Sequence, residues 1–343
     1  MNNSIDLNSS FSIINEMEMR VPEIERVIPL SAIGQFLIVT KNCTIQLWHV
    51  NDMLLDTNIL SQLNEYRKTI SDGYNIKESE GEHCSFNIRG YCESPDSTKI
   101  LLYYNIQILT SDVGYGWEIC SIFVELVLRD LSVSKIVPSK PISSYIEFDK
   151  VHDCYISKYS KDGATAKFDK KSLKVVDEME MFLYDEKFYV DNERLLLIGK
   201  GFDSNLNIWS LQNYVKLQSI LINEKIFDFV FNSKSQQVVA LDRISNNIII
   251  YDIGNQDISK IELIREIHYF YSLKIFLMSN ADCLLLPYSV EHTIDVYDLK
   301  TMSYVTSIDH DDYIEDSKIE IDKHQNSLYT ITSDNTLRKF TLI

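Results

Sequence analysis

Histidine and cysteine side chains lie close together in the sequence at two places, where zinc coordination or nucleophilic chemistry would have to be sought first. His83 and Cys84 precede Cys92, and His152 stands two residues before Cys154. Neither group supplies the four ligands of a structural zinc site. The seven histidines include no HxxxH pair, and the chain lacks a G-x-S-x-G motif and a glycine-rich phosphate loop. The sequence therefore predicts no catalytic residue, no bound metal and no cofactor.

Two aromatic side chains suggest binding rather than catalysis. Tyr115 and Trp117 alternate with Gly114 and Gly116 inside the segment of residues 111–120. Aromatic rings at an exposed loop tip are frequent anchors of protein interfaces. The alternative interpretation is that both rings fold back onto a neighbouring helix.

Clustered acidic side chains are the second candidate for binding. The chain has 50 acidic and 33 basic residues, which gives a net charge of −17. Clusters expected between repeats include the proposed partner-binding residues Asp177, Glu178, Glu180, Asp309, Asp311, Asp312, Glu315 and Asp316. Such a surface would attract a basic segment of a partner protein and repel nucleic acid and anionic membranes. Alternatively, these loops are only solvated and their charge keeps the protein soluble.

A repeated strand ending indicates which elements must position these residues. Bulky anchors recur at intervals of 41, 42, 46 and 43 residues, at Phe168, Trp209, Tyr251, Tyr297 and Phe340. A period in the forties is typical of the four-stranded blades of a propeller. Seven third strands can be counted, at residues 45–50, 125–131, 165–170, 206–211, 248–253, 294–299 and 337–342. These observations predict an all-β, seven-bladed β-propeller in which residues 1–343 form a single domain.

The strand endings Ile248-Ile-Ile-Tyr-Asp-Ile253 and Ile294-Asp-Val-Tyr-Asp-Leu299 resemble the WD40 repeat, in which the third strand ends in Trp-Asp or a relative of it. The resemblance covers roughly residues 26–343, although no unit has the Gly-His pair of that family. Only the last unit approaches the family's polar network, with His310, Ser333, Asp334 and Phe340. We therefore expect packing more than a polar network to join the blades. Residues 293–308 are also similar to the repeat of bacterial YVTN-type propellers.

The last unit ends directly after its third strand, so it lacks an outer strand. The surplus segment of residues 11–19 can supply this strand and close the last blade, which removes open sheet edges.

The period is broken once. From Trp48 to Arg129, taken as the equivalent anchor of the second unit, the spacing is 81 residues. We interpret the excess as two insertions on the side of blade 2, at residues 60–82 and 111–120, and a hidden eighth blade is the alternative. Leu60, Leu63, Tyr66 and Ile70 have helical spacing within the first insertion. In a meander of antiparallel strands both insertions project from the face that carries the acidic connections.

Composition limits the setting in which the protein works. The six cysteines form no CxxC pair, the first twenty residues do not resemble a signal peptide, and no apolar run is long enough to span a bilayer. An intracellular protein of the cytoplasm or nucleus is expected. Its predicted function is that of a non-enzymatic scaffold in a larger assembly, without direct nucleic-acid contact, membrane binding or homo-oligomerisation. The alternatives are a lactonase-like propeller hydrolase and a protein-contacting subunit of a nucleic-acid-processing complex.

Overall fold

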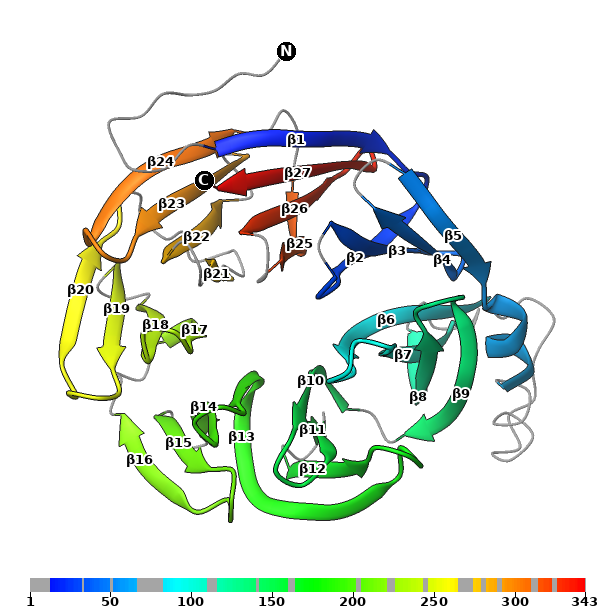
Figure 1. Cartoon of the computed structure of the whole chain (residues 1–343), viewed down its shortest axis with the longest axis horizontal. Coiled ribbons are helices and arrows are strands. Elements are labelled where there is room, and N and C mark those ends of the chain that lie inside the picture. The colour runs from blue at the N-terminus through cyan, green and yellow to red at the C-terminus, as the bar shows by residue number, and fades with distance from the viewer. Residues whose placement is uncertain are drawn as a thin grey trace. The chain divides into compact units, whose positions relative to one another are not determined.

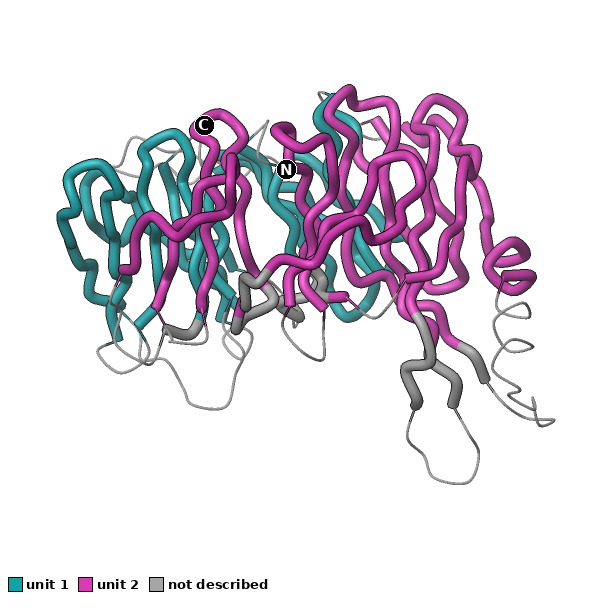
Figure 2. The backbone as a smooth tube through the Cα atoms, turned by 90° about the horizontal axis from the view of Figure 1, so that it is seen from below, with its two compact units in different colours: residues 1–35, 222–343 teal, residues 36–221 magenta. Residues whose placement is uncertain are grey.

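The computed structural model describes most of the chain, which folds into two compact units (Figure 2). Unit 1 comprises residues 1–35 and 222–343, and unit 2 comprises residues 36–221. The described residues are 13–32, 34–49, 52–66, 83–109, 116–139, 142–159, 164–201, 205–220, 226–242, 246–264, 274–278, 282–288, 292–309, 314–322 and 326–342.

Most strands form antiparallel sheets of four in which neighbours follow chain order. Blade 1 consists of β2 (Ile24–Pro29), β3 (Gln35–Thr40), β4 (Thr44–His49) and β5 (Asp52–Asn58), and the division between the units falls within it. Blade 2 consists of β6 (His83–Glu93), β7 (Lys99–Leu109), β8 (Gly116–Val127) and β9 (Ser132–Ser139).

Blades 3 and 4 share one long strand. Blade 3 consists of β10 (Ile142–Asp149), β11 (Cys154–Tyr159), β12 (Ala164–Asp169) and the first half of β13 (Val175–Asp191). The second half of β13 begins blade 4, followed by β14 (Leu196–Gly201), β15 (Leu206–Ser210) and β16 (Lys216–Ile220). Because β13 continues without a break, these two blades form one seven-stranded sheet (Figure 1).

The remaining blades belong to unit 1. Blade 5 consists of β17 (Ile226–Asn232), β18 (Gln237–Asp242), β19 (Asn247–Asp252) and β20 (Ile258–Glu262). Blade 6 consists of β21 (Phe276–Met278), β22 (Cys283–Tyr288), β23 (Thr293–Asp298) and β24 (Ser303–Asp309). Blade 7 consists of β25 (Ile314–Asp322), β26 (Ser327–Thr332), β27 (Thr336–Leu342) and the N-terminal strand β1 (Ile13–Arg20).

The predicted fold class, a seven-bladed β-propeller, is confirmed, and so is the closing role of the N-terminal strand. Strand β1 pairs antiparallel with β27, from Ile13 opposite Leu342 to Arg20 opposite Thr336 (Figure 1). Met17 is buried at 4% exposure in this strand. Two ion pairs follow the same junction, from Lys339 to Glu16 at 2.9 Å and from Arg338 to Glu18 at 3.3 Å. These two acidic residues therefore help to close blade 7.

The anchor predicted for blade 2 is wrong by three residues. Strand β8 ends at Val127, so Arg129 lies in the following turn, and the third strand does not extend over residues 125–131. The anchor position is Leu126, which is fully buried and stands 42 residues before Phe168. The period was missed there because an aliphatic residue replaces the aromatic one.

A β-bulge in the outer strand marks the anchor position in six blades. Opposite Trp48, for example, the pairing shifts so that Leu54 of β5 has no direct partner. The same shift occurs at Leu126, Phe168, Trp209, Tyr297 and Phe340. A bulge bends an edge strand and opposes further strand pairing. It also explains why bulged apolar residues such as Leu54 and Leu217 are exposed at 48% and 60%.

Asparagine and aspartate side chains build the turns that join first to second and third to fourth strands. Asp191 Oδ1 accepts the backbone N–H of Glu193 at 3.0 Å, and Asp252 Oδ1 accepts that of Gly254 at 2.8 Å. The residue four positions later has a left-handed backbone, with φ of 60° at Leu195 and 64° at Gln256. Equivalent turns begin at Asp149, Asp169, Asn232 and Asp298. These side chains thus have a structural role in their own turns.

Close packing in blade 4 depends on Gly199 of β14. A Cβ atom at this position would lie 2.6 Å from Leu183 Cδ2 and 3.4 Å from Phe188 Cβ. Gly199→Ala is therefore expected to lower the free energy of unfolding by about 2 kcal/mol, measured by thermal and chemical denaturation. Gly254→Ala is the control, because its nearest neighbour would be Asp252 Oδ1 at 3.3 Å in an exposed turn. Equal melting of the two variants would contradict this account of the packing.

Candidate functional site

The second predicted insertion continues the strands of blade 2. Residues 116–120 belong to β8, where Gly116 pairs with Leu109 and Trp117 with Ile108 of β7. The insertion therefore lengthens a β-hairpin. Tyr115 lies outside the described residues, and only the backbone of Trp117 is described. The two aromatic anchors stay predictions.

The first predicted insertion begins as a helix, formed by residues 60–66 and visible at the edge of unit 2 in Figure 2. The Asn58 side chain accepts the backbone N–H of Leu60 at 3.0 Å, which satisfies a donor in the first turn of the helix. Ile59 and Leu63 are fully buried and attach the helix to unit 2. Residues 67–82, including the predicted continuation to Ile70, lie outside the described residues.

Three predicted acidic residues lie in a strand and not in a connection between blades. Asp177, Glu178 and Glu180 belong to β13, in the half that forms the outer strand of blade 3. Asp177 Oδ2 lies 3.0 Å from Lys167 Nζ, so its charge is partly neutralised. Glu178 is exposed, and the side chain of Glu180 is not described. The prediction missed this because β13 passes from one blade to the next without a loop.

The acidic residues before blade 7 are only partly described. Asp309 is the last residue of β24, its side chain is exposed, and we find no hydrogen bond or ion pair for it within the described residues. Asp311 and Asp312 lie outside the described residues. Glu315 and Asp316 lie in β25, with only their backbone described. This group belongs to unit 1, and Asp177 and Glu178 belong to unit 2.

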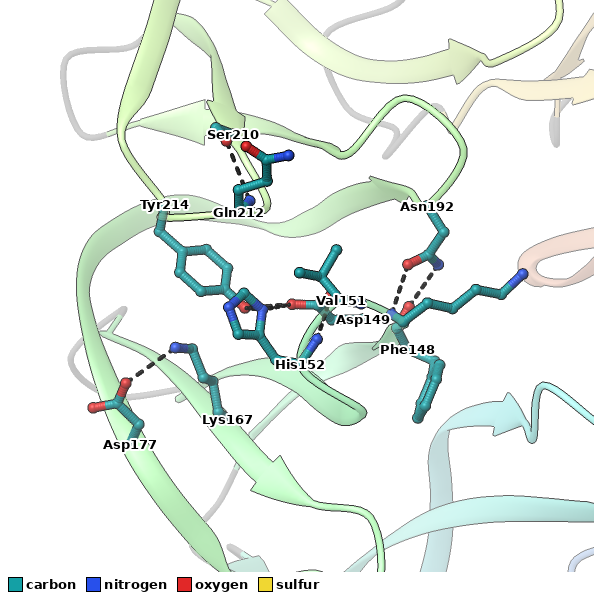
Figure 3. A network of polar contacts seen from close by, with 11 residues as sticks. Phe148, Asp149, Val151, His152, Lys167, Asp177, Asn192, Ser210, Gln212 and Tyr214 are labelled. Carbon is teal, nitrogen blue, oxygen red and sulfur yellow. Dashed lines mark hydrogen bonds and ion pairs between the residues drawn. The ribbon is translucent and has the colours of Figure 1, made fainter.

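The most completely defined polar cluster joins blades 3 and 4 within unit 2 (Figure 3). It lies at the end of the strands where turns join first to second and third to fourth strands. Its centre is the Asp149 carboxylate, which is fully buried at the end of β10. Oδ1 accepts the backbone N–H groups of Val151 and His152 at 2.8 and 3.3 Å. Oδ2 accepts the hydroxyl hydrogen of Tyr214 and lies 2.7 Å from His152 Nδ1. The buried charge is therefore surrounded by donors, as burial requires.

Tyr214 comes from the turn between β15 and β16 and reaches across to blade 3. Its ring stacks on the His152 imidazole with centroids 5.0 Å apart, and Lys167 Nζ lies 4.2 Å from its centroid. Burial, reinforced by the hydrogen bond to Asp149 and the charge of that carboxylate, raises the pKa of Tyr214 above its usual range. The hydroxyl therefore remains protonated and continues to donate to Asp149.

Further hydrogen bonds connect neighbouring blades of unit 2. Asn192 of the β13–β14 turn donates from Nδ2 to the Phe148 carbonyl at 2.7 Å, and its Oδ1 accepts the Lys150 N–H at 2.7 Å. The Tyr103 hydroxyl of blade 2 donates to the Ile142 carbonyl of blade 3 at 3.1 Å and accepts the Ile142 N–H at 2.7 Å. Buried polar contacts therefore accompany packing at two of the blade junctions.

The same cluster contains one of the two His and Cys groups noted in the sequence. Burial, followed by the charge of Asp149, raises the pKa of the Cys154 thiol to about 11, which opposes thiolate formation. The His152 imidazole directs Nδ1 toward Asp149 and Tyr214 and is 31% exposed. Within the described residues, no three His, Cys, Asp or Glu side chains are grouped as a metal site would require. The contacts shown are those of a junction between blades.

The arrangement of strands defines the protein as a seven-bladed β-propeller. The polar contacts around Asp149 join two blades, and charged turns surround them. No protein-family model matches the chain, and a search of curated proteins found no significant match. The described helices include none long and apolar enough to cross a bilayer.

Proposed function

We propose that the protein is a non-enzymatic, WD40-like interaction scaffold that binds a basic segment of a partner protein through the acidic connections between its blades. Blade 2 would contribute the tip of the β7–β8 hairpin, with Tyr115 and Trp117 as apolar anchors. Loops that interrupt a regular scaffold are where binding residues concentrate. The proposed setting is a larger assembly in the cytoplasm or nucleus.

The observation that carries this proposal is the exposed carboxylate of Asp309 at the end of β24. In the turns from first to second and third to fourth strands, side chains such as Asp191 and Asp252 accept backbone N–H groups. Asp309 stands at the other end, where β24 leads toward the next blade, and it is exposed. Carboxylates that do not support a turn remain available to a cationic partner, and the net charge of −17 attracts such a partner over distance.

Reversing the charge before blade 7 tests the proposal. The triple variant Asp309→Lys, Asp311→Lys and Asp312→Lys is expected to bind a labelled peptide rich in arginine and lysine about ten-fold more weakly, measured by fluorescence anisotropy. Its binding should also depend less on salt. The control variant replaces Asp52, Asp56 and Asp257 by lysine. These residues are exposed on β5 and in the β19–β20 turn, and the control changes the net charge by the same amount as the triple variant.

Trp117→Ala separates the apolar contribution from the charge, and it should weaken the complex without changing its salt dependence. A complex that is indifferent to both the charge reversal and Trp117→Ala would contradict the proposed surface. A stoichiometric transition metal in the purified protein would instead favour the hydrolase alternative.

A further inference from the structure

Exposed lysine side chains lie close together on two turns of blade 3, although the chain as a whole is strongly acidic. Lys150 lies in the turn between β10 and β11, and Lys171 and Lys174 lie in the turn between β12 and β13. All three side chains are exposed, and we find no hydrogen bond or ion pair for their ammonium groups within the described residues. His152 adds a half-buried imidazole beside Lys150.

These two turns form one continuous surface. Cys154 and Asp169, which border the two turns, are paired in the β11–β12 ladder. Lys170 of the second turn reaches Asp153 of the first, with Nζ 3.1 Å from Oδ1. We call the set Lys150, Val151, His152, Lys171, Lys174 and Val175 the blade 3 turn surface.

The aspartates of these turns offset only part of the lysine charge. Asp149 is fully buried and its oxygens face Tyr214, His152 and two backbone N–H groups (Figure 3). Asp169 Oδ1 accepts the Ser172 N–H at 2.6 Å, and hydrogen bonds from Ser172, with a smaller contribution from the charge of Lys171, hold the pKa of Asp169 below its usual value, so this carboxylate stays ionised and offsets part of the lysine charge. Asp153 is paired with Lys170. Lysines therefore remain in excess over carboxylates on these two turns, while the exposed Asp177 and Glu178 lie just beyond Val175 in β13.

Apolar side chains lie between the cations. Val151, flanked by Lys150 and His152, is 42% exposed, and Val175, which follows Lys174, is 40% exposed. Burial of such groups against a partner is favourable, and it selects a ligand that carries apolar side chains as well as negative charge. The turn that carries Val151 is held in position by Asp149 and by the Asn192–Lys150 hydrogen bond. A rigid surface of this kind loses little conformational entropy on binding.

We infer that the blade 3 turn surface binds an acidic segment of a partner protein in which glutamate or aspartate alternates with apolar residues. A protein segment fits better than a nucleic acid, because the net charge of −17 repels a long polyanion and the exposed valines offer no hydrogen bonds to phosphates. A second copy of this chain fits less well, because two chains that each carry a net charge of −17 repel one another. This surface is distinct from the acidic connection before blade 7, although Asp177 and Glu178 lie just beyond it in β13, so the protein would present two surfaces of opposite charge.

The test uses a labelled peptide of alternating glutamate and leucine, with fluorescence anisotropy as the readout. The double variant Lys150→Glu and Lys171→Glu is expected to bind it at least ten-fold more weakly than the unaltered protein. The control variant Lys41→Glu and Lys260→Glu changes two exposed lysines on blades 1 and 5, and its affinity should stay within about two-fold. Val151→Ser should weaken binding while leaving the salt dependence unchanged.

A peptide of alternating lysine and leucine provides the reciprocal experiment, and it should bind the Lys150→Glu and Lys171→Glu variant more tightly than the unaltered protein. Equal loss of binding in the control variant would overturn the inference, because it would show an effect of net charge alone. Equal affinity for a glutamate–serine peptide would overturn the apolar component. Tighter binding of a DNA oligonucleotide, or self-association abolished by the double variant in sedimentation, would replace the proposed partner with a nucleic acid or a second copy.

Discussion

Removal of residues 1–20 is expected to lower the melting temperature by about 10 °C, because blade 7 then loses its outer strand. Without β1, the Met17 side chain no longer covers the sheet, and Lys339 and Arg338 lose Glu16 and Glu18. The exposed edge of β27 would also offer unpaired backbone groups to other chains. We therefore expect the shortened protein to self-associate, as measured by light scattering alongside circular dichroism.

Two controls make this prediction specific to strand β1. Removal of residues 1–12, which ends before β1, should leave the melting temperature unchanged. Addition of a peptide with the sequence of residues 13–21 should restore part of the lost stability to the shortened protein, because strand pairing with β27 can form between separate chains. A protein lacking residues 1–20 that melts with the full chain would show that β1 does not close the blade.

Replacement of Asp149 by alanine is expected to lower the free energy of unfolding by about 3 kcal/mol, with a fall of about 5 °C in melting temperature. The carboxylate is fully buried and interacts with Tyr214, His152 and two backbone N–H groups. Its loss leaves these donors unsatisfied in a buried position, which costs more than the bonds themselves contribute. The matched control is Asp252→Ala, where Oδ1 accepts two backbone N–H groups of its own turn, and about 1 kcal/mol is expected.

A double-mutant cycle isolates the contact between blades within this cluster. Tyr214→Phe removes the hydroxyl alone, and Asp149→Asn removes the acceptor at Oδ2 while the turn can keep its Oδ1 acceptor. The two substitutions should show a coupling of about 1–2 kcal/mol in denaturation experiments. Additive effects would mean that the Tyr214–Asp149 hydrogen bond contributes nothing to holding blades 3 and 4 together.

The repeated anchors were sufficient to predict the fold class, because each blade places a bulky side chain at the same buried position. Trp48, Phe168, Tyr251 and Tyr297 lie in third strands as expected. Where the anchor is aliphatic, as at Leu126, the pattern is indistinguishable from any apolar run, and the blade 2 strand was misplaced. The prediction that residues 11–19 supply the outer strand of blade 7 is also confirmed, because β1 pairs with β27.

The candidate binding residues were harder to predict, because their positions depend on where strands end. The sequence around Asp177 contains no signal that β13 runs through two blades, so its acidic residues were assigned to a loop. A signal for the turns does exist, namely Asp or Asn four positions before a residue with positive φ, as at Asp191 and Leu195. It is hidden because the chain has few glycines and places leucine, glutamine or methionine at the left-handed position.

The sequence by itself determined the number of blades, the identity of most third strands and the acidic character of the protein, because these follow from local periodicity and composition. The tertiary structure alone decided that Asp149 and Tyr214, 65 residues apart, share a hydrogen bond. It also decided that the lysines of two turns of blade 3 lie next to one another, because Cys154 and Asp169 pair in the β11–β12 ladder. Such juxtapositions depend on the packing of one blade against the next, which a one-dimensional pattern does not encode.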